Sequence, residues 1–245
     1  MSPLWRDEIG VLLAPGKVVL TRMKRGLRPT CERHRTIVIE DGIFTDFGPA
    51  LAVLARELNE GEWQNANARV LVSDQWARYS IVPWSDDLHG SQERAAHARV
   101  FLERTYGASA EDWTVTLSDA EPGQAQVAAA LPTSLLTQLE SLLAGRVGPT
   151  ISIQPQLIAS FNVWRRRLPV EGGWFVCIDD GSFAAAQIGP DGWLRVQSVR
   201  IGNDWPAELR RLVKFSRLAA QGSATHRVYV DAPMALRVGA SAHAI

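Results

Sequence analysis

The sequence contains few cysteines and no long apolar run. Only Cys31 and Cys177 occur among 245 residues, too few for a disulfide framework, and Cys177 stands in an apolar segment that is typical of a buried free thiol. We therefore expect a reducing, cytoplasmic location. No stretch approaches 18 uninterrupted apolar residues and the N-terminus lacks a leader pattern. The sequence therefore predicts neither a secretion signal nor direct insertion into a membrane.

An excess of either charge is also missing. Lys and Arg total 26, and Asp and Glu total 26, a balance that argues against general binding of nucleic acid or of anionic lipid. The motifs G-x-S-x-G, G-x-x-x-x-G-K-[ST] and H-E-x-x-H do not occur, and the five histidines stand at no mutual metal-ligand spacing. We therefore predict no metal site and no common hydrolase or P-loop activity.

One basic cluster stands out against this neutral background. Between Arg22 and Arg35 the chain carries six Lys or Arg residues. We interpret the cluster as a solvated loop between strands, with a docking patch for an acidic partner as the alternative.

The most informative stretch runs from Gly172 to Gly202. Apolar, β-branched and aromatic runs alternate there with Asp-Gly turns, which predicts a three-stranded antiparallel meander. A helix follows, with Asn203 or Asp204 as its N-cap and an apolar stripe that includes Leu209 and Val213. His226 to Val230 then predicts a further strand.

The same order of elements occurs near the start of the chain. Strands are predicted at Ile9–Leu13, Lys17–Met23 and Thr36–Ile39, then a helix around Leu51–Leu58, then a strand at Ala68–Val72. The two halves share this pattern but no residue-level identity. A tandem duplication of this kind resembles the actin-like fold, which implies two α/β lobes around a cleft.

Four segments in this order extend the resemblance over roughly residues 10–232: VSDQWARYSIVPW, SQERAAHARVFLERTYG, ISIQPQLIASFNVWRR and WFVCIDDGSFAAAQIGPDGW. They are similar to actin-like proteins of type IV pilus and type II secretion machines, namely PilM-like proteins and the cytoplasmic domain of GspL. The resemblance implies a mixed α/β, RNase H-like fold of two lobes. We place the first lobe at 1–168, with an inserted subdomain at about 74–150, and the second lobe at 169–245.

An actin-like nucleotide site needs two glycine-bearing hairpins and an acidic residue near the phosphates. The first hairpin reads Ala14-Pro15-Gly16-Lys17, without an acid and with one N–H donor removed by proline. The second reads Asp179-Asp180-Gly181-Ser182, and the segment after the last strand has no glycine pair. The candidate cofactor residues are therefore Gly16, Lys17, Asp179, Asp180, Gly181 and Ser182. We predict weak or no binding of ATP and magnesium, and no hydrolysis.

The resemblance also implies partners. Such proteins bind the short cytoplasmic tail of an inner-membrane assembly protein and connect it to an assembly ATPase, and they allow a homodimer. Aromatic residues are favoured anchors at interfaces, so we expect partner contacts at Arg78, Tyr79, Pro83, Trp84 and Trp164. The prediction is a non-catalytic scaffold that lies beside the inner membrane through its partners. The alternative is an active ATPase or sugar kinase of the same fold that uses Asp179 or Asp180 for its metal.

Overall fold

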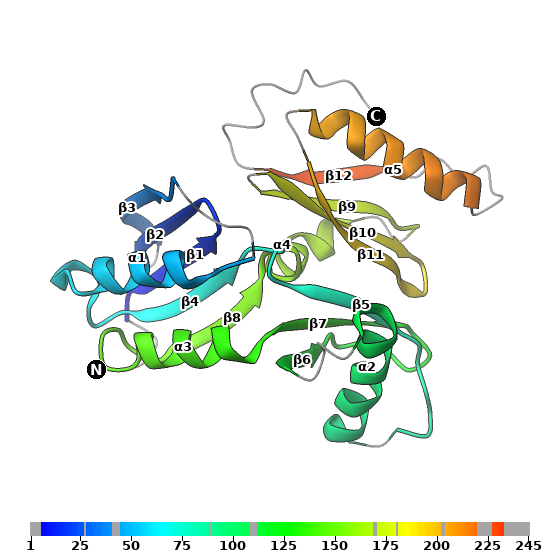
Figure 1. Cartoon of the computed structure of the whole chain (residues 1–245), viewed down its shortest axis with the longest axis horizontal. Helices are drawn as coiled ribbons and strands as arrows, with labels where there is room; N and C mark the ends of the chain where they lie inside the picture. Colours follow the sequence, from blue (N-terminus) through cyan, green and yellow to red (C-terminus); the bar gives the residue numbers. More distant parts are fainter. Residues whose placement is uncertain are drawn as a thin grey trace. The chain divides into compact units, whose positions relative to one another are not determined.

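The computed structural model describes residues 6–26, 28–40, 45–88, 90–107, 112–168, 171–179, 181–201, 204–219 and 227–232 (Figure 1). The chain divides into two compact units. The first unit comprises Met1–Arg78, Asp112–Thr114 and Ala130–Ala159, and the second comprises Tyr79–Glu111, Val115–Ala129 and Ser160–Ile245. Two lobes divided at residue 168 stay a prediction. Within the described ranges, no helix is both long and apolar enough to cross a membrane.

The first unit contains a five-stranded sheet in the order β3-β2-β1-β4-β8. Its strands are β1 (Glu8–Ala14), β2 (Lys17–Lys24), β3 (Thr30–Val38), β4 (Asn67–Val72) and β8 (Thr150–Pro155). β1, β2 and β3 pair antiparallel, whereas β4 and β8 are parallel to β1. Alternating apolar residues such as Val11 and Leu13 are buried on one face, as the period of two requires.

Two helices pack on this sheet. α1 (Gly48–Leu58) contacts β1 and β2, α3 (Thr133–Leu143) contacts β8, and the two helices contact each other. Figure 1 shows both running along the sheet. The buried stripe of α1 includes Leu51, Leu54 and Leu58, at the spacing that places them on one helical face. A short 3₁₀ turn, η2 (Gly61–Trp63), then leads into β4 and buries Trp63 completely.

The second unit contains a four-stranded sheet in the order β11-β10-β9-β12. β9 (Gly173–Asp179), β10 (Ser182–Gly189) and β11 (Gly192–Arg200) form the predicted meander, and β12 (Val228–Asp231) pairs parallel with β9. The strand predicted at His226–Val230 is therefore present, starting two residues later and ending one residue later, and His226 lies outside the described residues. Every residue of β9 is buried, which fits a central strand covered on both faces.

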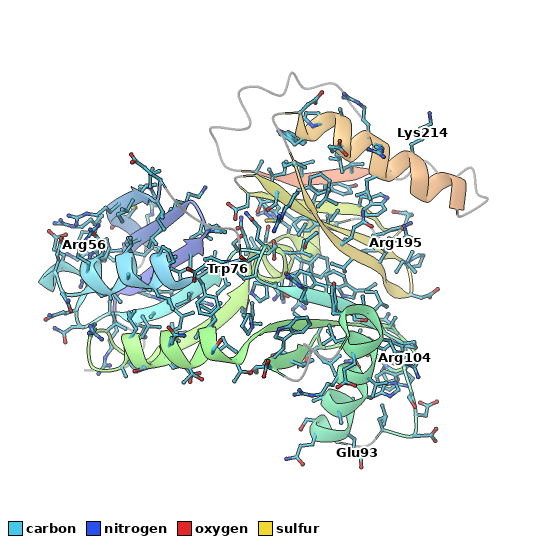
Figure 2. The ribbon with its side chains drawn as sticks, in the orientation of Figure 1. Arg56, Trp76, Glu93, Arg104, Arg195 and Lys214 are labelled. Carbon is cyan, nitrogen blue, oxygen red and sulfur yellow. The ribbon has the colours of Figure 1, made fainter. Side chains whose placement is uncertain are left out.

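One face of this sheet packs on α5 (Trp205–Ala219). Trp174, Val176 and Ile178 of β9 form a core cluster with Leu209 and Val213 of the helix. Lys214 projects from another side of α5 (Figure 2).

The start of α5 follows the prediction. Asp204 accepts a hydrogen bond from the Ala207 amide at 3.1 Å, as an N-cap does. Asn203, the other predicted cap, lies outside the described residues.

Further elements lie between the two repeated patterns. β5 (Arg78–Val82), α2 (Ser91–Tyr106), β6 (Trp113–Leu117) and β7 (Gln126–Pro132) include a three-stranded sheet in the order β5-β7-β6. α4 (Gln156–Trp164) and the 3₁₀ turn η4 (Arg165–Arg167) precede β9. The Phe161 ring of α4 lies 5.8 Å from the ring of Phe175, on the face of β9 that points away from the core cluster.

Candidate functional sites

The first repeat hairpin has a two-residue turn at Pro15 and Gly16, closed by the pair Ala14 and Lys17. Pro15 is buried and has no N–H to offer an anion. The Gly16 carbonyl accepts a hydrogen bond from the Ile39 amide at 2.9 Å. Lys17 is half-buried. The turn therefore carries no carboxylate that could organise a metal ion.

The second repeat hairpin is chemically richer. Asp179 pairs with Ser182 across the turn, and each residue is only 3% exposed. Gly181 has a φ of 75°, a conformation that favours glycine. Its carbonyl accepts a hydrogen bond from the Ile201 amide at 2.9 Å. Asp180, the remaining predicted cofactor residue of this turn, lies outside the described residues.

The two hairpins share a main-chain hydrogen bond that sequence reasoning did not identify. In each, the second turn residue is glycine, and its carbonyl accepts from an isoleucine just beyond the third strand, Ile39 or Ile201. The expectation that the repeats share no residue-level identity is therefore wrong at these positions. Gly16 and Ile39 are separated by 23 residues and Gly181 and Ile201 by 20, so an ungapped comparison misses the correspondence.

The segment after the last strand is described only as far as Ala232. Asp231 accepts a hydrogen bond from the Ser160 hydroxyl, and Ala232 is buried. Residues 233–245 lie outside the described part of the chain. In the described residues, no group of three or more His, Cys, Asp or Glu side chains is placed to hold a metal ion.

The arginines of β2 and β3 are paired inside the first unit. The interpretation of residues 22–35 as a loop is wrong, because most of them belong to these two strands. Arg35 binds Glu57 at 2.7 Å and Glu60 at 2.5 Å, and these hydrogen bonds raise the pKa of its guanidinium. Arg33 pairs with Glu62. These charges hold β3 in place, which explains why a basic segment adopts a strand at a sheet edge.

Carboxylates of β1 and the residue before it add to this network. The hydrogen bond from Arg69 lowers the pKa of Glu8, whereas burial would raise it. A hydrogen bond from Arg25 also lowers this pKa. Burial alone would raise the pKa of Asp7, but hydrogen bonds from the Arg22 side chain and the Arg25 amide outweigh it, so this pKa is also lowered.

Two of the predicted partner residues are engaged by their own neighbours. The Arg78 guanidinium donates to the carbonyls of Gln75 and Ala77, at 3.1 and 2.8 Å. Tyr79 is 3% exposed, and its carbonyl accepts from the Tyr106 hydroxyl at 3.1 Å. These contacts fix the start of β5, and they leave little of the Tyr79 side chain on the surface.

The other three predicted residues are more accessible. Pro83 is exposed, and Trp84 is half-buried, with its indole N–H donating to Asp86 at 2.7 Å. Trp164 lines a cavity beside β12 that contains neither Pro83 nor Trp84. That these five residues contact a partner stays a prediction.

A groove lies among the inserted elements. Its volume is about 530 Å³. The first turns of α2, the strand β6 with the loop after it, and the start of β7 line the groove: Ser91, Gln92, Arg94, Ala95, Val115–Ala120 and Gln126. Sequence reasoning did not identify the groove between this helix and this strand.

The main chain of β6 gives this groove an open edge, because β6 is the last strand of its sheet in the described part of the chain. The Ser118 amide donates to the Val127 carbonyl at 2.9 Å. Since successive residues of a strand direct their amides to opposite sides, Val115 and Leu117 present theirs outward. Gln126 donates to the Ser118 carbonyl at 2.6 Å and fixes this end of the strand.

The helix side of the groove favours negative charge. The N-cap of α2 is Gly90, which provides no side-chain hydrogen bond, so the first N–H groups of the helix have no such acceptor. Arg94 lines the groove one turn further on. Figure 2 labels Glu93 in this first turn and Arg104 towards the other end of the helix.

Asp74 is a buried helix-capping residue that sequence reasoning missed. It is 2% exposed, and its two carboxylate oxygens lie 3.1 and 3.0 Å from the Leu157 amide at the start of α4. A carboxylate at a helix N-terminus satisfies an amide that has no partner within the helix. An aspartate two residues after a buried strand was the available signal, but its partner stands 83 residues away.

No protein-family model and no curated protein matches this sequence. Solved structures do match. The PilM-PilN type IV pilus biogenesis complex aligns with a TM-score of 0.65 at 14% identity over 92% of this chain and 81% of the matched chain. A Bacteroides thetaiotaomicron protein with an actin-like ATPase fold and unknown function gives 0.63 at 8% identity, over 98% and 88%. This chain has the actin-like fold.

A further structure extends the comparison. The cytoplasmic domain of EpsL, an inner-membrane component of the type II secretion system of Vibrio cholerae, aligns with a TM-score of 0.58 at 11% identity. The alignment covers 93% of this chain and 82% of that domain. The predicted mixed α/β, actin-like fold and the predicted resemblance to PilM-like and GspL-like proteins are thus confirmed at the level of the fold.

Proposed function

We propose that this protein is a non-catalytic, actin-like scaffold of a pilus or secretion assembly at the inner membrane. It binds the cytoplasmic tail of a membrane protein in the groove between α2 and β6. The observation that carries the proposal is the groove itself, which combines an open strand edge with the start of a helix. The likeness to PilM in its complex with PilN, and to the cytoplasmic domain of EpsL, supports this choice of partner.

The chemistry of the groove suits an extended, acidic segment. Main-chain groups of Val115 and Leu117 can pair with an added strand. Exposed sheet edges of other proteins bind extended peptides in this way. Arg94 has no carboxylate partner among the described residues, so that an acidic side chain of the tail can pair with it.

The turn of the first hairpin argues against ATP hydrolysis by this chain. Pro15 and Gly16 stand where a phosphate-binding turn would present an acid and free N–H groups. A scaffold needs only the shape of the fold, since fold does not fix function. The assembly ATPase would then be a separate protein connected through this scaffold.

The test replaces Thr116 in the groove with a photo-crosslinking amino acid, and Thr137 on α3 serves as the exposed control. Crosslinking in cells should capture the cytoplasmic tail of one inner-membrane protein from position 116 and not from 137. A synthetic copy of that tail should bind the purified chain, and Arg94→Glu should weaken binding at least tenfold. Arg104→Glu, on the same helix but outside the groove, should leave binding unchanged. Equal capture from both positions would reject the groove.

A further inference from the structure

Among the residues that the structure describes, the sheet of the second unit is one strand shorter than its counterpart. In the first unit, β3-β2-β1-β4 is followed by β8, which pairs parallel with β4. In the second unit, the equivalent order β11-β10-β9-β12 ends at β12. Since the strands correspond in order and direction, the side of β12 away from β9 is the position that β8 fills in the first repeat.

The hydrogen bonds of β12 show which groups face this open side. The Trp174 amide donates to the Arg227 carbonyl at 2.8 Å, and Val228 stands opposite Trp174 in the parallel register. In a parallel pair, alternate residues direct their main-chain groups to the partner strand. Arg227, Tyr229 and Asp231 therefore face β9. The N–H and C=O groups of Val228 and Val230 face outward.

A cavity lies beside this edge. It has a volume of about 360 Å³, and it is lined by Trp164, Arg167, Leu168, Phe175 and residues 228–231 of β12. Tyr229 stands opposite Phe175, so both project to the face that also carries Phe161 of α4. An apolar side chain from a strand added next to Tyr229 would point into this cavity, because neighbouring residues of paired strands share a face.

One arginine lines the cavity and three more stand near its lining residues in the chain. Arg167 of η4 lines the cavity, Arg165 and Arg166 precede it in η4, and Arg227 directly precedes β12. Within the described part of the chain, none of these four forms an ion pair with a carboxylate. The Arg167 guanidinium instead lies 5.0 Å from the ring of Trp164 at the cavity wall. Asp231, the acid of β12, is hydrogen-bonded to Ser160.

We propose that the outer edge of β12 is a second binding site, which takes an extended, acidic segment of a partner polypeptide as the fifth strand of this sheet. Backbone groups of Val228 and Val230 pair with the segment, an apolar side chain fills the cavity, and a carboxylate pairs with Arg167. The site is separate from the α2–β6 groove, so each can fail without the other.

Fluorescence anisotropy of two labelled eight-residue peptides tests the proposal. Both alternate Val with polar residues, which are Glu and Thr in one peptide and Lys and Thr in the other. The acidic peptide should bind at least tenfold more tightly, and Arg167→Gln should remove most of that difference. Val230→Pro should weaken binding at least tenfold, because it deletes an outward N–H and leaves the β9 ladder intact. Val230→Thr keeps the N–H and should bind normally.

Amide hydrogen exchange identifies the occupant. The amides of Val228 and Val230 should exchange freely in the isolated chain and become protected when the acidic peptide is added. Protection without peptide at every protein concentration would mean that residues 233–245 occupy the edge. Protection that rises with protein concentration would mean a second copy of the chain. Either result, or equal binding of the peptide by the Val230→Pro variant, would overturn the proposal.

Discussion

The junction between η4 and β9 should be among the least substitutable points of the second unit. Gly173 has a φ of 153°, and a Cβ atom there would lie 2.6 Å from the Arg227 carbonyl oxygen. That carbonyl is the acceptor for the Trp174 amide. Because the obstacle is backbone, a Gly173→Ala change must displace β12 from β9.

The expected magnitude follows from two contributions. A non-glycine residue in this region of φ costs about 1–3 kcal/mol. Losing the hydrogen bond of Trp174 and leaving its buried amide without a partner costs about another 1–3 kcal/mol. We therefore expect Gly173→Ala to lower the free energy of unfolding by about 2–6 kcal/mol, the lower figure holding if β12 relaxes.

Urea unfolding followed by tryptophan fluorescence measures this effect, since Trp174 is fully buried beside the substitution. The midpoint should fall by about 1 M or more. Gly123→Ala is the matched control, because Gly123 has a φ of 85° with no atom within 4 Å of a Cβ. The Gly123→Ala variant should lose only the free energy of unfolding that a non-glycine residue loses at positive φ. Equal losses for the two variants would refute the close approach of Arg227, and with it the register of β12.

Three further predictions concern other parts of the chain. Asp74→Ala should lower stability by about 1–3 kcal/mol, because the Leu157 amide loses its buried acceptor, and thermal unfolding with Asp74→Asn as the comparison measures this. Glu8→Gln should lower the free energy of unfolding by about 0.5–1 kcal/mol at pH 7. The pKa of Glu8 is lowered in the folded chain from its ordinary value of 4.5, so its contribution is present above pH 4.5 and is lost as the pH falls below it; a cost that persists at pH 2 would contradict this. Isothermal titration should detect no micromolar binding of ATP with magnesium, whereas the alternative of an active ATPase requires turnover that Asp180→Asn abolishes.

Much of the fold could be predicted from local patterns. The meander of the second unit follows from Asp-Gly turns between apolar runs, and its register places Asp179 opposite Ser182 as those turns require. α1 and α3 follow from leucines at helical spacing. Trp174 is buried, as its position in the meander suggested.

The features that could not be predicted depend on distant partners. β3 carries so many charges that local propensity favours a loop, and its pairing with β2 together with the acids near α1 makes the strand favourable. Asp74 caps a helix 83 residues away. The α2–β6 groove is lined by segments that are far apart in the sequence, and Gln126 donates to the Ser118 carbonyl at its end, which no spacing in the sequence reveals.

The attachment of β3 has a consequence for the behaviour of the chain in different buffers. Most of its residues are exposed, and on the side of α1 its arginines are held by Glu57, Glu60 and Glu62. Dissolved ions screen such contacts, and the screening length falls from about 10 Å at 0.1 M to about 3 Å at 1 M ionic strength. Concentrated salt should therefore weaken the attachment of β3 while the apolar core of the first unit stays folded. The stability of this edge strand thus depends on the ionic strength of the buffer.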